Sequence, residues 1–251
     1  MSDDRDVFYA MFGLGFGVWG FFHGFQTFRK KQLIDDIPTS TVRGLAMGMV
    51  ELTGRAGREV LLKGPLTKED CVAYTYLIER YESSGKSGRW VTVAKGDSFQ
   101  RDFFVEDDTE RITVVPQGAE FICNVVFSLN NEWGTSIPSN LIDFMAGNGI
   151  SYGGFFGNST MRFTERNIKP GEQVFVLGTA KKNDNASAAQ PDDVVIGLGE
   201  TEKTFIISDK SQKDLDQSLG GQIVWGILGG AAAALFCLWY ILTRFGIIHS
   251  F

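Results

Sequence analysis

Histidine is almost absent from this chain of 251 residues, which has only His23 and His249, each in or beside a long apolar segment. A serine or cysteine nucleophile needs a neighbouring base, usually histidine. The sequence therefore excludes Ser/His or Cys/His catalysis in the middle of the isolated chain. Because His23 lies only a turn or so from Arg29, we expect an interfacial histidine there rather than a haem or proton ligand.

Cysteine and clustered basic residues are also scarce. Cys71, Cys123 and Cys237 are an odd number without C-x-x-C spacing, which argues against a disulfide framework or zinc cluster. A single bridge between Cys71 and Cys123 stays open. The net charge is −6, and the only tight basic cluster lies at residues 29–31. We expect no metal, no cofactor and no nucleic-acid partner.

Long apolar runs, in contrast, stand at both ends. Residues 7–28 are uncharged, and at about 1.5 Å per residue they would cross a hydrocarbon core of about 30 Å. Residues 223–248 are long enough to do the same. We therefore predict two transmembrane helices that enclose a middle domain at 29–214. The remaining segments are a polar tail at 1–6, a juxtamembrane helix or linker at 215–222 and a tail at 249–251.

The first apolar run contains "GFGVWG" at residues 15–20, which matches the nucleotide-binding pattern G-x-G-x-x-G. That pattern works only after a strand and before a helix, because the phosphates must meet free N–H groups at a helix N-terminus. No strand can precede it within a membrane segment. The nucleotide interpretation is therefore rejected.

Small residues form a stripe along each predicted helix. Their spacing of three and four residues places them on one helical face, where they would let helix backbones approach closely in lipid. We predict that the two stripes pack against each other or against a partner helix. The stripe residues are Gly13, Gly17, Gly20 and Gly24 in the first segment, and Gly226, Gly230, Ala233 and Cys237 in the second.

The middle domain has the sequence pattern of β-structure. Residues 40–53 read as one long strand, and 71–81 alternate apolar residues with the period of a strand. About ten short strands without alternating long helices favour a mainly β fold, an antiparallel barrel or sandwich-like domain. One short helix is expected at 140–146, with Ser139 as its N-cap and Gly147 as its end.

Two further stretches of the middle domain have distinct composition. The acidic residues 106–110 are interpreted as a hairpin turn rather than a cation site. Residues 144–158 are either a loop that contacts a partner or the membrane surface, or an irregular part of the core. That stretch combines five glycines with Phe144, Met145, Tyr152, Phe155 and Phe156.

Several segments together resemble one known family. They lie at residues 38–56, 65–81, 103–116, 165–180 and 204–215, and their order is that of the GIDE family. This resemblance implies a membrane-flanked β domain, as in a mitochondrial RING-type E3 ubiquitin ligase and in many bacterial and archaeal proteins. In the eukaryotic member a zinc-binding RING finger follows the second helix. Here the sequence ends about three residues after that segment, so we expect the prokaryotic type that lacks the RING.

The sequence therefore favours a non-enzymatic membrane protein whose β domain binds or scaffolds a protein partner, or a homo-oligomer, in a larger membrane complex. The alternative is an accessory component of an E3 ligase-like or other enzyme system whose catalytic module is on another chain. The basic residues 29–31 predict a cytoplasmic middle domain in a prokaryotic cell membrane by the positive-inside rule. The eukaryotic resemblance implies the opposite side.

Overall fold

A computed structural model describes residues 3–37, 39–84, 87–131, 136–150, 153–154, 157–158, 160–183, 194–210 and 225–244. The chain forms two compact units, which are described separately. One unit contains both ends of the chain, Met1–Ile37 and Gln212–Phe251, and the other is Pro38–Ser211. The chain is mainly β-structure, as the sequence predicts.

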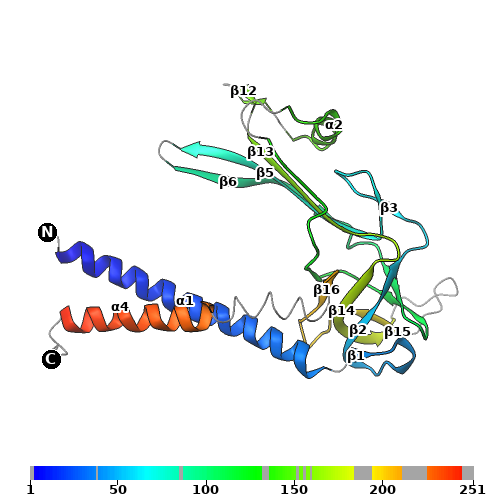
Figure 1. Cartoon of the computed structure of the whole chain (residues 1–251), viewed down its shortest axis with the longest axis horizontal. Coiled ribbons are helices and arrows are strands. Elements are labelled where there is room, and N and C mark those ends of the chain that lie inside the picture. Colours follow the sequence, from blue (N-terminus) through cyan, green and yellow to red (C-terminus); the bar gives the residue numbers. More distant parts are fainter. Residues whose placement is uncertain are drawn as a thin grey trace. The chain divides into compact units, whose positions relative to one another are not determined.

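The terminal unit is a pair of helices. Helix α1 spans Asp3–Asp36 and is longer at both ends than the predicted segment 7–28. A π-helical turn, η2 (Trp225–Gly229), leads into α4 (Gly230–Arg244). Figure 1 shows α1 and α4 side by side, and many residues of each lie close to the other. The predicted linker 215–222 lies outside the described residues.

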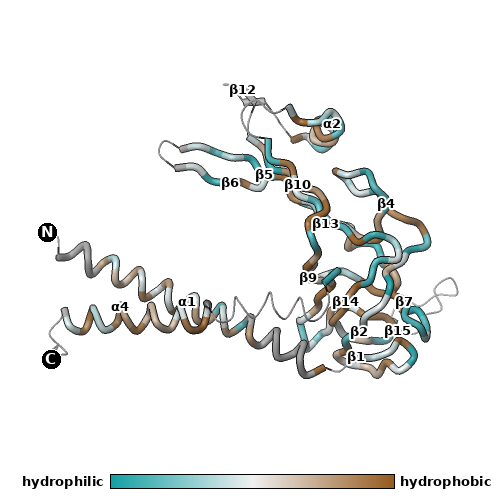
Figure 2. Tube along the Cα trace, viewed as in Figure 1, coloured by the Kyte–Doolittle hydropathy of each residue, from teal (hydrophilic) through white to brown (hydrophobic). Residues whose placement is uncertain are grey.

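One described helical stretch is long and apolar enough to cross a membrane. It is Gly226–Thr243, which comprises most of η2 and of α4. Figure 2 shows hydrophobic residues along this helix. Helix α1 does not meet the same criterion within its described residues. Its phenylalanines are interspersed with glycines, Trp19 and His23, and these interspersed residues contribute little to the hydrophobicity of the helix.

The middle unit is built on a closed β-barrel. Its strands are β2 (Gly48–Gly57), β7 (Phe103–Glu106), β8 (Arg111–Val114), β14 (Gln173–Lys182) and β15 (Val194–Gly197). They lie in the ring order β2-β7-β8-β15-β14, and β14 closes the ring by pairing with β2. A five-stranded Greek-key barrel of this kind has the architecture of the OB-fold, which by itself implies no function.

The barrel is not wholly antiparallel, which corrects the prediction. Strands β8 and β15 pair in parallel, with Thr113 opposite Val195, whereas the other four pairings of the ring are antiparallel. The reason is geometric. Strand directions cannot alternate all the way round a ring with an odd number of strands, so at least one pair must be parallel.

Three short strands extend the sheet beyond the ring. β1 (Thr39–Ser40) lies parallel to β2, β16 (Ile206–Ser208) pairs with the first half of β14, and β9 (Glu120–Phe121) lies parallel to β16. The interior is apolar and almost completely closed to solvent. Its members without exposed surface include Leu52, Val105, Val176, Ile196 and Ile207.

The predicted strand at 40–53 is wrong in its first half. The chain forms a 3-10 turn, η1 (Val42–Gly44), and β2 begins only at Gly48, whose φ is +119°. The cause lies in another segment, because the Val42 N–H donates a hydrogen bond to Asp107 Oδ2 at 2.8 Å. That contact draws Val42 into the barrel core and bends the chain before β2.

Asp107 lies in the turn between β7 and β8, so the predicted hairpin turn is confirmed. Its carboxylate also accepts hydrogen bonds from Thr109 and from the Glu110 N–H. Partial burial raises the pKa of Asp107, but the hydrogen bonds from Thr109, Val42 and Glu110 outweigh it and hold this pKa at about 2.

A second sheet, of four strands, belongs to the same unit. Its order is β10-β13-β5-β6, and all three pairings are antiparallel. Figure 1 shows β5, β6 and β13 as long strands. The strands are β10 (Phe127–Asn130), β13 (Met161–Ile168), β5 (Ala73–Ser84) and β6 (Ser87–Asp97).

Helix α2 (Ser139–Gly147) confirms the helix predicted at 140–146. Leu141 and Met145, one helical turn apart, are buried with Ile78 and Phe163 of the four-stranded sheet. The predicted N-cap is wrong by one residue. Ser139 is the first residue of the helix, and the cap is Pro138, which provides no side-chain hydrogen bond.

All three cysteines are free. No bridge joins Cys71 and Cys123, the pairing that the sequence left open, and both are buried. Burial, with a further contribution from the nearby Glu165 carboxylate, raises the pKa of Cys71 to about 11. Burial also raises the pKa of Cys123. Both thiols therefore stay protonated and weakly nucleophilic at neutral pH.

Candidate functional site

The two helices of the terminal unit contact each other through backbone at their glycines. A Cβ atom built on Gly17 would lie 2.7 Å from the Ala234 nitrogen, and one on Gly24 would lie 2.7 Å from the Ile227 nitrogen. A Cβ on Gly230 would lie 2.6 Å from the Phe21 nitrogen. Such distances leave no space for any side chain, so only glycine permits this approach.

Most of the predicted stripe residues meet at this contact. Gly13 faces the Cys237 sulfur, Gly20 faces Gly230, and Gly24 faces Gly226. Ala233 does not belong to it, because it is exposed, and the backbone of the next residue, Ala234, makes the contact instead. Gly15, which belongs to the nucleotide motif but not to the stripe, points elsewhere, and a Cβ atom built on it would meet nothing within 4 Å.

The contacts define a constant antiparallel register. Gly24 lies beside Gly226 and Gly13 beside Cys237, so each step back along α1 matches a step forward along α4. By this register the apolar window Gly226–Thr243 lies alongside about residues 7–24 of α1. Eighteen residues rise about 27 Å, close to the thickness of a hydrocarbon core.

The register can be tested by a disulfide. Replacing Gly13 with Cys puts a Cβ atom 2.7 Å from the Cys237 sulfur, which allows a disulfide bond once that side chain shifts by a few tenths of an ångström. We expect Gly13→Cys to form an intramolecular bond with Cys237 under mild oxidation in membranes, as measured by peptide mass spectrometry. Gly15→Cys is the matched control and should stay unbridged. Equal bridging in the two variants would contradict the register.

The predicted aromatic loop at 144–158 is divided by the structure. Both residues belong to α2: Met145 is buried on the face of the helix that meets the sheet, and Phe144 is partly buried with its ring edge-on to Tyr76, 5.4 Å between centroids. For these two residues the core interpretation is therefore correct. Beyond Ile150, the described parts of the stretch are the short strands β11 (Gly153–Gly154) and β12 (Gly157–Asn158). Tyr152, Phe155 and Phe156 lie outside the described residues.

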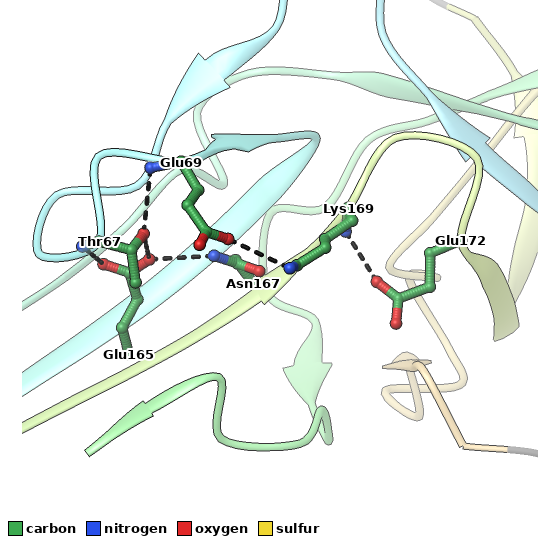
Figure 3. A network of polar contacts seen from close by, with 6 residues as sticks. All are labelled: Thr67, Glu69, Glu165, Asn167, Lys169 and Glu172. Atoms are coloured by element: carbon green, nitrogen blue, oxygen red, sulfur yellow. Dashed lines mark hydrogen bonds and ion pairs between the residues drawn. The ribbon is translucent and has the colours of Figure 1, made fainter.

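A buried carboxylate lies beside this helix. Glu165 of β13 is fully buried, and Figure 3 shows its carboxylate between Thr67 and Asn167. It accepts hydrogen bonds from the Leu66 N–H at 2.7 Å and the Thr67 N–H at 3.2 Å. The Thr67 hydroxyl at 2.6 Å and the Asn167 amide at 3.0 Å complete the set.

This carboxylate holds the loop between β3 (Leu62–Lys63) and β4 (Asp70–Cys71) in place. The loop delivers Leu66 into the core under α2, and the Asn140 amide donates to the Leu66 carbonyl at 3.3 Å. At the surface, Lys169 forms an ion pair with Glu69 at 3.1 Å, drawn in Figure 3. Because solvent does not reach Glu165, this carboxylate organises structure rather than chemistry.

Replacing Glu165 should therefore be costly. Glu165→Leu removes the acceptor of the Leu66 and Thr67 N–H groups, the Thr67 hydroxyl and the buried Asn167 amide, and we expect a loss of about 3 kcal/mol in unfolding free energy. Urea unfolding of the full-length protein in detergent measures it. The control is Glu69→Gln, which removes only the exposed ion pair and should cost less than about 1 kcal/mol. Equal losses would refute the assigned role of Glu165.

Chemically competent groups are sparse in the described part of the chain. No group of three or more His, Cys, Asp or Glu residues there could hold a metal ion. A half-open pocket of about 350 Å³ is lined by Lys63, Tyr74, Asp97 and Arg101 among others. Lys63 is ion-paired with Asp70 at 2.8 Å, and burial raises the pKa of the Tyr74 phenol, so neither group is an activated nucleophile.

The fold thus defines a class: a barrel-based β domain joined at both ends to a closely packed helix pair. A family model described as "GIDE: E3 Ubiquitin ligase" matches residues 74–241, about two thirds of the chain. The chain therefore belongs to the GIDE family, as its sequence segments indicate. Searches of curated proteins and of solved structures gave no match.

Sequence reasoning missed two features of these sites. It did not single out Glu165, although the alternation of β13 places this residue on the same face as buried Met161 and Phe163. A carboxylate on an apolar strand face is a recognisable signal of a buried polar network. It also chose Ala233 rather than Ala234, because a three-residue and a four-residue step both fit a helical stripe.

Proposed function

We propose that this protein is a non-enzymatic membrane protein whose paired helices anchor a β domain that binds or scaffolds a protein partner. The observation that carries the proposal is the glycine contact between α1 and α4, which stays in one register from Gly226 to Cys237 within the apolar window. Glycine contacts of this kind are the usual means by which helices associate in lipid.

The second span in this proposal is α1. Its register with α4 gives residues 7–24 the same depth as the membrane-capable window. The side chains that face away from α4 are large and apolar: Phe12, Phe16 and Phe22 are 69%, 72% and 61% exposed. Exposure of so many aromatic rings to water is unfavourable, whereas lipid tails accommodate them.

Partner binding is proposed for the β domain because its described residues carry no evident catalytic centre. The pocket at Lys63 and Tyr74 lacks an activated nucleophile, and Glu165 is closed to solvent. A domain fixed to a membrane without its own chemistry is typical of a subunit that recruits or positions another protein.

A second candidate function is favoured by the family match. The GIDE model is described as an E3 ubiquitin ligase, so the domain would serve as an accessory component of a ligase-like or other enzyme system. In that case the catalytic module lies on another chain. A point change in the β domain would then alter the activity of the assembled enzyme, which a purely structural scaffold does not require.

The glycine contact provides a test of the anchored complex. Gly17→Leu forces the helices apart, since its side chain would overlap the Ala234 backbone, whereas Gly15→Leu meets no atom within 4 Å. After extraction in mild detergent, we expect the wild type and Gly15→Leu to elute as a stable complex larger than one chain. Gly17→Leu should lose thermal stability and complex size. A wild-type protein that elutes alone, without a co-purifying chain, would overturn the proposal.

For orientation we propose that the β domain is cytoplasmic, because residues 29–31, Arg-Lys-Lys, directly follow the first apolar segment. In inverted inner-membrane vesicles the cytoplasmic face is outside. Added protease should therefore digest the β domain there and leave it intact in right-side-out spheroplasts. Protection in the inverted vesicles would reverse the assignment, and a soluble cytoplasmic protein serves as the digestion control.

A further inference from the structure

The four-stranded sheet has one face beneath α2 and a second face that points away from it. Ile78 and Phe163 lie opposite each other on the α2 face. Strand residues one position away point to the other side, so Glu79, Tyr81 and Arg162 belong to the second face. Trp90 joins them, because it lies directly opposite Tyr81. We call this second surface the open face; the side chains named on it are half-buried or exposed.

Three large side chains on the open face are held in one cluster. The Arg162 guanidinium lies over the Trp90 ring, 3.9 Å from its centroid, and the Tyr81 ring meets Trp90 edge-on at 5.3 Å. Tyr81 also lies against Gly88, where an added Cβ atom would overlap its hydroxyl. These contacts fix the side chains before any partner arrives, which lowers the entropic cost of binding.

The Arg162 guanidinium is held in one orientation, but not all of its hydrogen-bond donors are used. Its Nε donates to Asn130 Oδ1 at 3.1 Å, and its Nη1 donates to Glu79 Oε2 at 3.4 Å. A guanidinium has five N–H groups, so among the described residues three of them have no acceptor in the structure. A guanidinium that is stacked on an aromatic ring still presents this edge to a carboxylate, which it binds through two parallel hydrogen bonds.

The charge of the open face favours the same ligand chemistry. Lys95, Arg162 and Arg166 outnumber Glu79 and Asp97 on it, whereas the chain as a whole carries −6. Tryptophan, tyrosine and arginine are also the residues in which binding energy concentrates at protein interfaces. A basic, aromatic and preorganised flat surface is therefore complementary to an acidic protein segment with an adjoining apolar side chain.

We propose that the open face docks a protein partner, which presents an aspartate or glutamate to Arg162 and an apolar side chain to Trp90 and Tyr81. The inference rests on the proposed partner-binding function and specifies its surface. The proposed interface lies on the four-stranded sheet rather than on the barrel.

Site-specific photo-cross-linking in the native host's membranes tests the open face. A benzoylphenylalanine at Thr92, which lies opposite Glu79 and is exposed, would report what covers the face in the full-length protein. We expect an adduct with another protein, joined within a segment that contains an acidic residue. Adducts with a second copy of this chain, with lipid, or with nothing would each overturn the proposal.

Charge reversal separates this surface from the proposed function as a whole. Arg162→Glu should reduce the adduct at least about tenfold, as loss of an interface hot spot does. Arg89→Glu is the matched control, because Arg89 pairs with Glu82 on the other face of the same hairpin, and it should leave the adduct unchanged. Arg162→Gln, with an unchanged melting temperature, checks that the loss is not caused by unfolding.

Co-purification of the detergent-extracted complex completes the distinction. If Arg162→Glu retains the complex and the adduct, the open face is not the docking surface while the partner-binding function stands. If the wild type yields no complex, the partner-binding function itself fails.

Discussion

The contact between two glycine-bearing helix backbones is the constraint from which the rest of this chain follows. Gly17 and Gly24 of α1 and Gly230 of α4 are closed to solvent, and none has room for a side chain. Because the two helices run antiparallel, the middle domain leaves α1 and returns to η2 at the same end of the pair. In the proposed arrangement, in which both helices span a membrane, the two attachments of the middle domain lie on the same side.

The middle domain has two separate hydrophobic cores, one in each of its two main parts. The barrel interior is apolar and closed, and the second core lies between α2 and the four-stranded sheet. Glu165 holds the loop at Leu66 and Thr67 to the sheet through hydrogen bonds to a carboxylate closed to solvent, and Asn140 of α2 bonds to the same loop. The barrel therefore supports the domain, while the four-stranded sheet carries the cluster of Arg162, Trp90 and Tyr81 on its surface.

Much of this could be read from the sequence, and the failures have definite physical causes. Apolar length and glycine spacing are local signals, so the helix pair and most of its contact residues were predictable. Helix α2 was also predictable from local signals, namely the residues that mark its start and its end. The strand at residues 40–53 was not, because its break depends on a hydrogen bond from Val42 to Asp107, far along the chain. The parallel pairing of β8 with β15 follows from ring closure, which no local pattern records.

The closing pair of the barrel also has a consequence for biosynthesis. Strand β2 ends at Gly57, and its partner β14 begins at Gln173, so more than a hundred residues must leave the ribosome before the ring can form. Contacts that span such distances form slowly, because loop closure has to precede them. Helix α4 is made later still. After α1 and β2 have been synthesised, β2 therefore lacks its closing partner until β14 follows. The barrel can close only shortly before the second helix is synthesised.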